Sequence, residues 1–252
     1  MSVLARVRAW SRPSRLAILL GVTAACVVLT ALWPRHPQDL AYHDFADRRA
    51  LLHVPNALNV VSNGGFPLAG AWALVRTARS TLVGGERVAG FVFGVGLLLT
   101  GLGSSWYHWA PSNATLVWDR LPLSALFPTV FAVAIGDRVS PAAGRALLAP
   151  LVLGAVASVI YWSRYDDLRP YGLAQFLPML LIPLMLVLFD GHRPTAPLIA
   201  GVVIYALGKG AELADGPIFS LGSLVSGHTV KHVLAAVASV FIARWLAPHV
   251  SR

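Results

Sequence analysis

The sequence has a single cysteine, Cys26, and only 12% of its 252 residues are charged. One cysteine excludes a disulfide framework and a cysteine-based metal site, so any metal must be held by His, Asp or Glu. A soluble domain carries roughly 25% charged residues to cover its surface. The shortage of charge, together with 56% apolar residues and a mean hydropathy of +0.67, therefore indicates a membrane protein.

Acidic residues are scarcer than basic ones, which gives a net charge of +9. Most of the basic residues lie in short segments between apolar runs and do not form a stripe along one element. Segments of this kind orient membrane helices. The excess of positive charge therefore serves to orient the helices in the membrane, and we expect no nucleic-acid partner.

Eight apolar runs have about the length needed to cross a 30 Å hydrocarbon core. Several contain proline, which is tolerated in a membrane helix where neighbouring helices satisfy the freed backbone groups. The connections are short and leave no room for an inserted soluble domain. The sequence predicts an all-α polytopic helix bundle with spans near 16–33, 56–75, 88–109, 115–136, 146–163, 171–189, 196–213 and 223–246.

Arginine placement predicts the orientation of the spans. Arginine-rich segments alternate with less basic ones along the chain, as the positive-inside rule requires for an even number of spans. Both termini are therefore expected in the cytoplasm, and we expect the inner membrane of a bacterium. The segments on that side carry Arg6, Arg8, Arg12 and Arg15, then Arg76, Arg79 and Arg87, then Arg138 and Arg145, then Arg193, then Arg244 and Arg252.

The first run has the basic start and apolar stretch of either a retained signal anchor or a cleaved signal peptide. Leu-Trp-Pro-Arg at 32–35 offers no small-residue cleavage site. We therefore expect a signal-anchor segment over residues 1–35, followed by a membrane domain over residues 36–252.

Ionisable residues inside spans are costly, so each one is a functional hypothesis. His108 lies at the outer end of the third span, Asp119 in the first turns of the fourth, and His228 and His232 near the start of the eighth. The predicted orientation places all four at one depth, in the non-cytoplasmic leaflet.

The histidine spacing predicts a metal site. His228 and His232 are four residues apart and share one helical face, so both can bind one ion. His108 would complete a set of three histidines with an open position, which is typical of catalytic zinc and of an activated water molecule.

Polar neighbours of the histidines predict the remaining chemistry. Ser104 lies one turn before His108 and would donate to a developing oxyanion, while Asp119 would act as general base or orient the water molecule. Ser62 and Asn63, in the second span, are candidate outer partners of the metal ligands.

Each feature has another interpretation when taken alone. The histidine pair suits a haem or quinone protein, and His108 lies among aromatic residues of an interfacial belt. Asp119 can pair with Arg120, and Ser104 lies in a small-residue stretch suited to helix packing. The shared depth of the four residues favours the metal site.

Two lysines and one glutamate complete the ionisable residues of the spans. Lys209 and Glu212 lie one turn apart and are expected to pair with each other. Lys231 is expected on a different face of its helix from the two histidines, paired with an acid or extended toward the interface.

Three blocks of sequence resemble the alkaline ceramidases, within the superfamily of seven-helix membrane hydrolases that includes the adiponectin-receptor-like proteins. The blocks are residues 59–63, residues 103–108 followed by Asp119, and residues 226–232. The resemblance covers roughly residues 42–246, so the first span is an addition to the seven-helix core. It implies zinc on His108, His228 and His232 and catalytic roles for Ser104 and Asp119.

Eukaryotic members of that family also carry a calcium site ahead of the first family helix. Here Asp44, Asp47 and Asn56 occupy the matching region, but Arg48 and Arg49 are added. Calcium prefers several oxygen ligands that include carboxylates. Either a Ca²⁺ site or loop salt bridges with the two arginines is therefore expected.

The sequence as a whole predicts a zinc-dependent amidohydrolase that cleaves ceramide or a ceramide-like lipid amide in the membrane. Its partners would be the lipid substrate and the bilayer, with no obligatory protein partner. A lipid-sensing receptor-like protein with a structural zinc is the main alternative, because a fold does not determine a substrate. A rhomboid-like serine protease with Ser104 as nucleophile is a further one.

Overall fold

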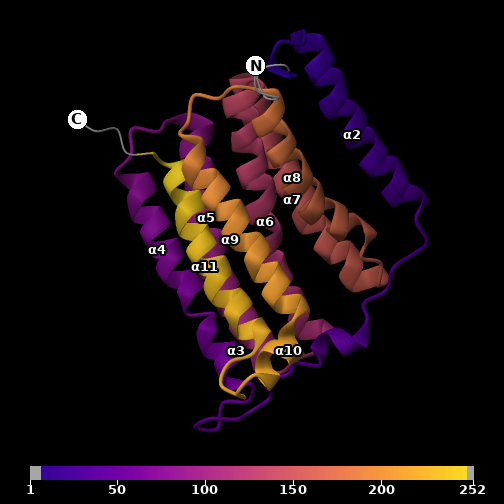
Figure 1. Ribbon diagram of the computed structural model, residues 1–252, viewed down its shortest axis with the longest axis vertical. Coiled ribbons are helices and arrows are strands. Elements are labelled where there is room, and N and C mark those ends of the chain that lie inside the picture. The colour runs from indigo at the N-terminus through magenta and orange to yellow at the C-terminus, as the bar shows by residue number, and fades with distance from the viewer. Residues whose placement is uncertain (1–6, 249–252) are drawn as a thin grey trace.

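The computed structural model describes residues 7–248, and its regular elements are all helices (Figure 1). This confirms the all-helical bundle expected from the sequence. In chain order the elements are α2 (Arg12–Leu32), the 3-10 helix η1 (Leu40–His43), α3 (Ala57–Ser62), α4 (Gly65–Ala78), α5 (Gly84–Trp109), α6 (Asn113–Arg138), α7 (Pro141–Tyr165), α8 (Arg169–Leu188), α9 (Thr195–Leu213), α10 (Asp215–Ser220) and α11 (Gly227–Leu246).

Seven of the described helices are long and apolar enough to cross a membrane: α2, α5, α6, α7, α8, α9 and α11. Their outward faces expose large apolar side chains, including those of Leu20, Leu99, Leu102 and Leu153. Apolar surface on this scale is suited to lipid and not to water. The chain therefore has the architecture of a multi-pass membrane protein.

The second expected span, 56–75, is not one continuous helix. It is broken into α3 and α4 at Asn63 and Gly64, where the backbone N–H groups bond to carbonyls three residues back. Pro67 follows in the first turn of α4, where a missing N–H costs little. The break redirects the chain so that Ser62 ends a short helix of its own.

The helices run alternately up and down the bundle. α5 ends, and α6 and α11 begin, at the end that also holds η1, α3 and α10 (Figure 1). We call this the η1 end. α2 begins and α11 ends at the opposite end, so the described chain starts and finishes on one side of the bundle, because α3 and α4 together also lead from one end to the other (Figure 1).

Most arginines of the predicted cytoplasmic segments lie at the end opposite η1. They include Arg12, Arg79, Arg138 and Arg193, in or next to the helix ends and loops there. Arg6 and Arg252 lie outside the described residues.

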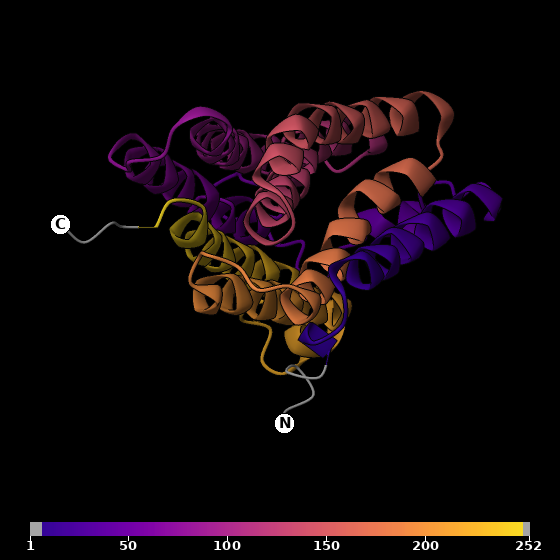
Figure 2. The ribbon, with the colours of Figure 1, turned by 90° about the horizontal axis from the view of Figure 1, so that it is seen from above.

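α2 packs beside α8 at the edge of the bundle (Figure 2). The segment that follows α2 is tied to the α7–α8 loop, where the backbone N–H of Gln38 donates to Asp166 at 3.0 Å. Asp167 in the same loop is bound by Arg169 at 2.7 Å, and this pairing lowers the pKa of Asp167 to about 2. The loop is thus fixed both by the segment that follows α2 and by its own ion pair.

Candidate metal centre

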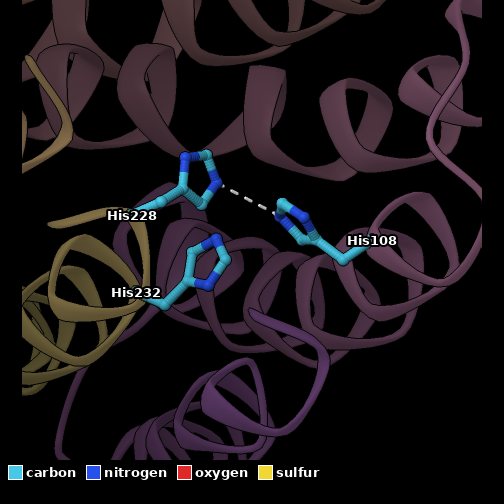
Figure 3. Close-up of side chains that lie close together, drawn as sticks. All are labelled: His108, His228 and His232. Carbon is cyan, nitrogen blue, oxygen red and sulfur yellow. Dashed lines mark hydrogen bonds between the residues drawn. The ribbon is translucent and has the colours of Figure 1, made fainter. Parts of the chain in front are cut away.

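Three histidines meet at the η1 end of the bundle. His108 comes from the last turn of α5, and His228 and His232 come from the first two turns of α11. All three are buried, and one ring nitrogen from each lies within 4.8 Å of the others (Figure 3). The histidines predicted to share one depth therefore form a group that could hold a metal ion.

The spacing of the nitrogens suits a tetrahedral ion. The Nε2 atoms of His108 and His228 are 3.3 Å apart. Two nitrogens that bind one tetrahedral ion at about 2.0–2.1 Å are separated by about 3.3–3.4 Å. The two rings therefore already have the spacing that shared ligation requires.

The orientation of the third imidazole is set by Ser62. The Ser62 hydroxyl lies 2.9 Å from Nδ1 of His232 and donates its own proton to the carbonyl of Asn59 at 3.1 Å. In the tautomer that carries its proton on Nδ1, His232 donates to Ser62, and Nε2 is then unprotonated and free to bind a metal. A hydrogen bond of this kind commonly orients a metal-ligating histidine.

Two glycines allow the helices that carry these residues to approach each other. A Cβ on Gly103 would overlap the carbonyl oxygen of Trp118, so α5 and α6 touch beside Ser104 and Asp119. A Cβ on Gly227 would overlap the carbonyl oxygen of Ala211, so the start of α11 packs against the end of α9. Glycine is needed at both positions because the backbones are in contact.

Asp215 fixes the start of α11. One of its carboxylate oxygens accepts from the backbone N–H of His228 at 2.7 Å, and the other accepts from Ala46 at 2.9 Å. Ser226 caps the same turn by accepting from Thr229. The sequence did not single out Asp215, because the residue lies outside the expected spans.

Phe45 covers the histidines on the side of the η1 loop. Its buried ring lies 4.7 Å from that of His108 and 4.8 Å from that of His228, measured between centroids. Tyr107 also packs on His108, with ring centroids 4.8 Å apart, and contacts the Phe45 ring at 5.9 Å. The Nδ1 atom of His108 has no hydrogen-bond partner, so packing against these rings holds the imidazole in place.

A cavity of about 960 Å³ reaches the centre from inside the bundle. Ser104, Asp119 and His232 line its polar part together with Arg120, Lys209, Glu212 and Lys231, and apolar side chains of α2, α6, α8, α9 and α11 line much of the remainder. The predicted catalytic residues and one predicted metal ligand therefore face a common space, whereas Phe45 closes the opposite side.

Lys231 reaches the centre, contrary to the expectation that it faces away from the histidines. Its ammonium group lies 3.0 Å from Nε2 of His228 and 2.9 Å from a carboxylate oxygen of Glu212. The long stem of lysine explains the difference, since its head can extend around the helix. The predicted pair of Lys209 with Glu212 is confirmed.

Two further predictions about polar residues concern Asn63 and Arg120. Asn63 is buried but donates to the carbonyl of Asn59 at 2.8 Å and contacts no histidine, so it closes the end of α3. Arg120 donates to Gln38 at 2.7 Å, and no ion pair with Asp119 is found among the described residues. The alternative interpretation of Asp119 as a structural partner of Arg120 is therefore not supported.

The residues of the expected calcium site are engaged in other contacts. Asp44 pairs with Arg48 at 2.6 Å and Asp47 with Arg49 at 2.8 Å, and the second pairing holds the pKa of Asp47 below its usual range. The side chain of Asn56 donates to the carbonyl of His108 at 2.9 Å. This loop has the salt bridges that were the alternative to calcium, because each carboxylate already has an adjacent guanidinium.

No protein-family model matches the chain, and no curated protein sequence matches it.

Proposed function

We propose that this protein is a zinc-dependent amidohydrolase related to the alkaline ceramidases, which cleaves the amide bond of ceramide or a ceramide-like lipid. The observation that carries the proposal is the meeting of three buried histidines with a large apolar cavity whose polar end presents Ser104 and Asp119. A long-chain lipid amide has the matching shape, with an apolar chain and one polar group to be cleaved.

His108, His228 and His232 would hold the zinc ion, and the donor set of three imidazoles suits it. Zinc, when bound, supplies Lewis acidity that activates water and polarises a carbonyl group. Asp119, which lines the cavity, would take a proton from the attacking water and return it to the leaving amine. The Ser104 hydroxyl would donate to the oxygen that gains negative charge in the reaction.

The apolar part of the cavity would receive the acyl chain. Its walls include Phe127 and Val130 of α6, Phe176 of α8 and Ile242 of α11. Leu29 and Trp33, from α2 and the residue after it, contribute as well. We propose that α2 is an addition to a seven-helix hydrolase core and that it forms one wall of the chain-binding space.

Metal analysis combined with a hydrolysis assay tests the proposal. Purified protein should contain one zinc per chain and release a fatty acid from a lipid amide, and His228→Ala and His232→Ala should lose both properties. His53→Ala, an exposed histidine in the loop before α3, is the matched control and should retain both. Full zinc occupancy in both variants of α11 would remove the proposed site, whereas bound zinc without turnover would favour the receptor-like alternative.

A further inference from the structure

The cavity beside the metal centre extends along two sides of α8. The residues of α8 that line it come from different faces of the helix. Tyr171 and Ile182 are buried within the bundle, whereas Phe176 and Leu180 are about half exposed on its outside. The apolar space therefore has two parts, which we call the inner arm and the outer arm.

The inner arm lies among α5, α6, α9 and α11. Its lining runs from Asp119 to Val130 on α6 and from His232 to Ile242 on α11. At a rise of about 1.5 Å per residue, both stretches are about 15 Å long. This length is about half of the roughly 30 Å hydrocarbon core of a bilayer, so it suits one lipid chain. Trp245, which follows on α11, is buried in the packed core beyond the arm.

The outer arm lies between α8 and α2, which runs along the outer side of α8 (Figure 2). The residues of α2 that line it recur at intervals of three and four positions, so they share one side of the chain. They are Cys26, Leu29, Thr30 and Trp33. Leu29 and Trp33 are also largely exposed, so this arm is open toward the surrounding lipid.

α2 is tied to the bundle at its two ends. Of its residues, all of which the structure describes, only Leu19 is buried. Arg15 donates to the carbonyl of Leu188, the last residue of α8, at 2.8 Å. At the η1 end, Arg169 in the first turn of α8 donates to the carbonyl of Trp33 at 2.6 Å. These bonds hold α2 beside α8 without close packing along its length, which leaves room for the outer arm.

We propose that the outer arm binds the second hydrocarbon chain of a two-chain lipid amide. This inference rests on the proposed amide hydrolysis and assigns the acyl chain to the inner arm and the chain of the amine to the outer arm. The carbonyl carbon and the nitrogen of an amide direct their substituents apart, as two arms beside one polar part require. The open side of the outer arm would let the released single-chain amine return to the bilayer.

Photocrosslinking with two ceramides tests this assignment. The two probes differ only in the position of a diazirine, which lies in the acyl chain of one and in the sphingoid chain of the other. The full-length protein is treated with a chelator and placed in phosphatidylcholine nanodiscs, so that no turnover contributes. Mass spectrometry should locate the acyl-chain adducts on α6 and α11 and the sphingoid-chain adducts on α2, between Cys26 and Trp33.

A bulky side chain in the outer arm should remove the adducts on α2. Thr30→Trp fills the space from α2, so labelling of α2 by the sphingoid-chain probe should be lost. A single-chain amide, N-hexadecanoylethanolamine with a diazirine in its acyl chain, should still label α6 and α11 in this variant, because it needs only the inner arm. Val28→Trp, on the outward side of α2, is the matched control and should behave like the wild type.

Several outcomes would overturn the two-arm assignment. Equal labelling of α2 by the two ceramides, or none by the sphingoid-chain probe, would do so in the wild-type protein alone. Equal labelling of α2 by phosphatidylcholine that carries the same diazirine would assign the outer arm to bulk lipid. Unchanged labelling of α2 in Thr30→Trp would also contradict it. Because no turnover is measured, a failure of the proposed hydrolysis leaves these outcomes unchanged.

Discussion

The hydroxyl of Ser62 and the Nδ1 atom of His232 lie 2.9 Å apart, although 170 positions separate them in the chain. Ser62 is the last residue of α3, directly before the break at Asn63 and Gly64 that separates α3 from α4. The irregular part of the bundle is therefore the part that orients a candidate metal ligand.

Replacing Ser62 by alanine should weaken metal binding. The variant loses the acceptor for Nδ1–H of His232, so neither the tautomer nor the ring orientation is held, and the loss of such a partner typically costs about 10-fold to 100-fold in metal affinity. Competition with a chromophoric chelator measures the effect. Ser105→Ala is the matched control, since the Ser105 hydroxyl bonds to the carbonyl of Val60 at 3.3 Å. An unchanged affinity in Ser62→Ala would mean that packing alone orients His232.

Replacing Asp119 by asparagine should abolish lipid-amide hydrolysis without removing the metal. Asparagine keeps the shape of the side chain but cannot accept a proton, and a positioned general base contributes about 10²–10⁴-fold to the rate. Hydrolysis and metal content are measured on the same preparation. Asp44→Asn, which removes an exposed carboxylate at the same end of the bundle, should change neither. Activity within a few-fold of wild type in Asp119→Asn would assign the proton transfer to another group.

The sequence was sufficient to predict the helices and the histidine group. Seven of the eight apolar runs coincide with a helix of membrane length, whereas the second is broken into α3 and α4, and the predicted common depth with helical spacing brings His108, His228 and His232 together. These inferences succeed because they depend on the length of an apolar run and on the spacing of residues along one helix, and both are local properties of the sequence. The ends of the runs differ by a few residues, since hydropathy does not detect helix caps such as Ser112 and Ser226.

The contacts that complete the centre could not be predicted in the same way. Phe45 and Asp215 come from connections between spans, whose course depends on tertiary packing. The direction of Arg120 depends on Trp162 of α7 and Tyr171 of α8, which hydropathy does not relate to it. Asp44 and Asp47 looked like calcium ligands because spacing alone does not distinguish a carboxylate for a metal from one for a neighbouring arginine.

Replacing Gly103 by alanine should destabilise the protein and lower its activity. The added methyl group would overlap the carbonyl oxygen of Trp118, so α5 must move away from α6 beside the predicted catalytic pair. Overpacking of this kind costs roughly 1–3 kcal/mol. Thermal unfolding in detergent measures the loss. Gly154→Ala in α7, where the methyl group meets nothing within 4 Å, should leave stability equal or higher. Similar midpoints for the two variants would show that α5 and α6 tolerate a wider separation.

Cysteine labelling should place the η1 end of the bundle on the non-cytoplasmic side of the membrane. Arginines crowd the opposite end, as Arg12, Arg79 and Arg138 illustrate, and the positive-inside rule keeps such an end in the cytoplasm. In a Cys26→Ala background, Ser220→Cys at the end of α10 and Thr81→Cys in the α4–α5 loop provide exposed positions on opposite ends. A membrane-impermeant maleimide should label Ser220→Cys in intact cells, and Thr81→Cys only after permeabilisation. The reverse labelling pattern would mean that the η1 end faces the cytoplasm, so that lipids would reach Ser104 and Asp119 from the cytoplasmic leaflet.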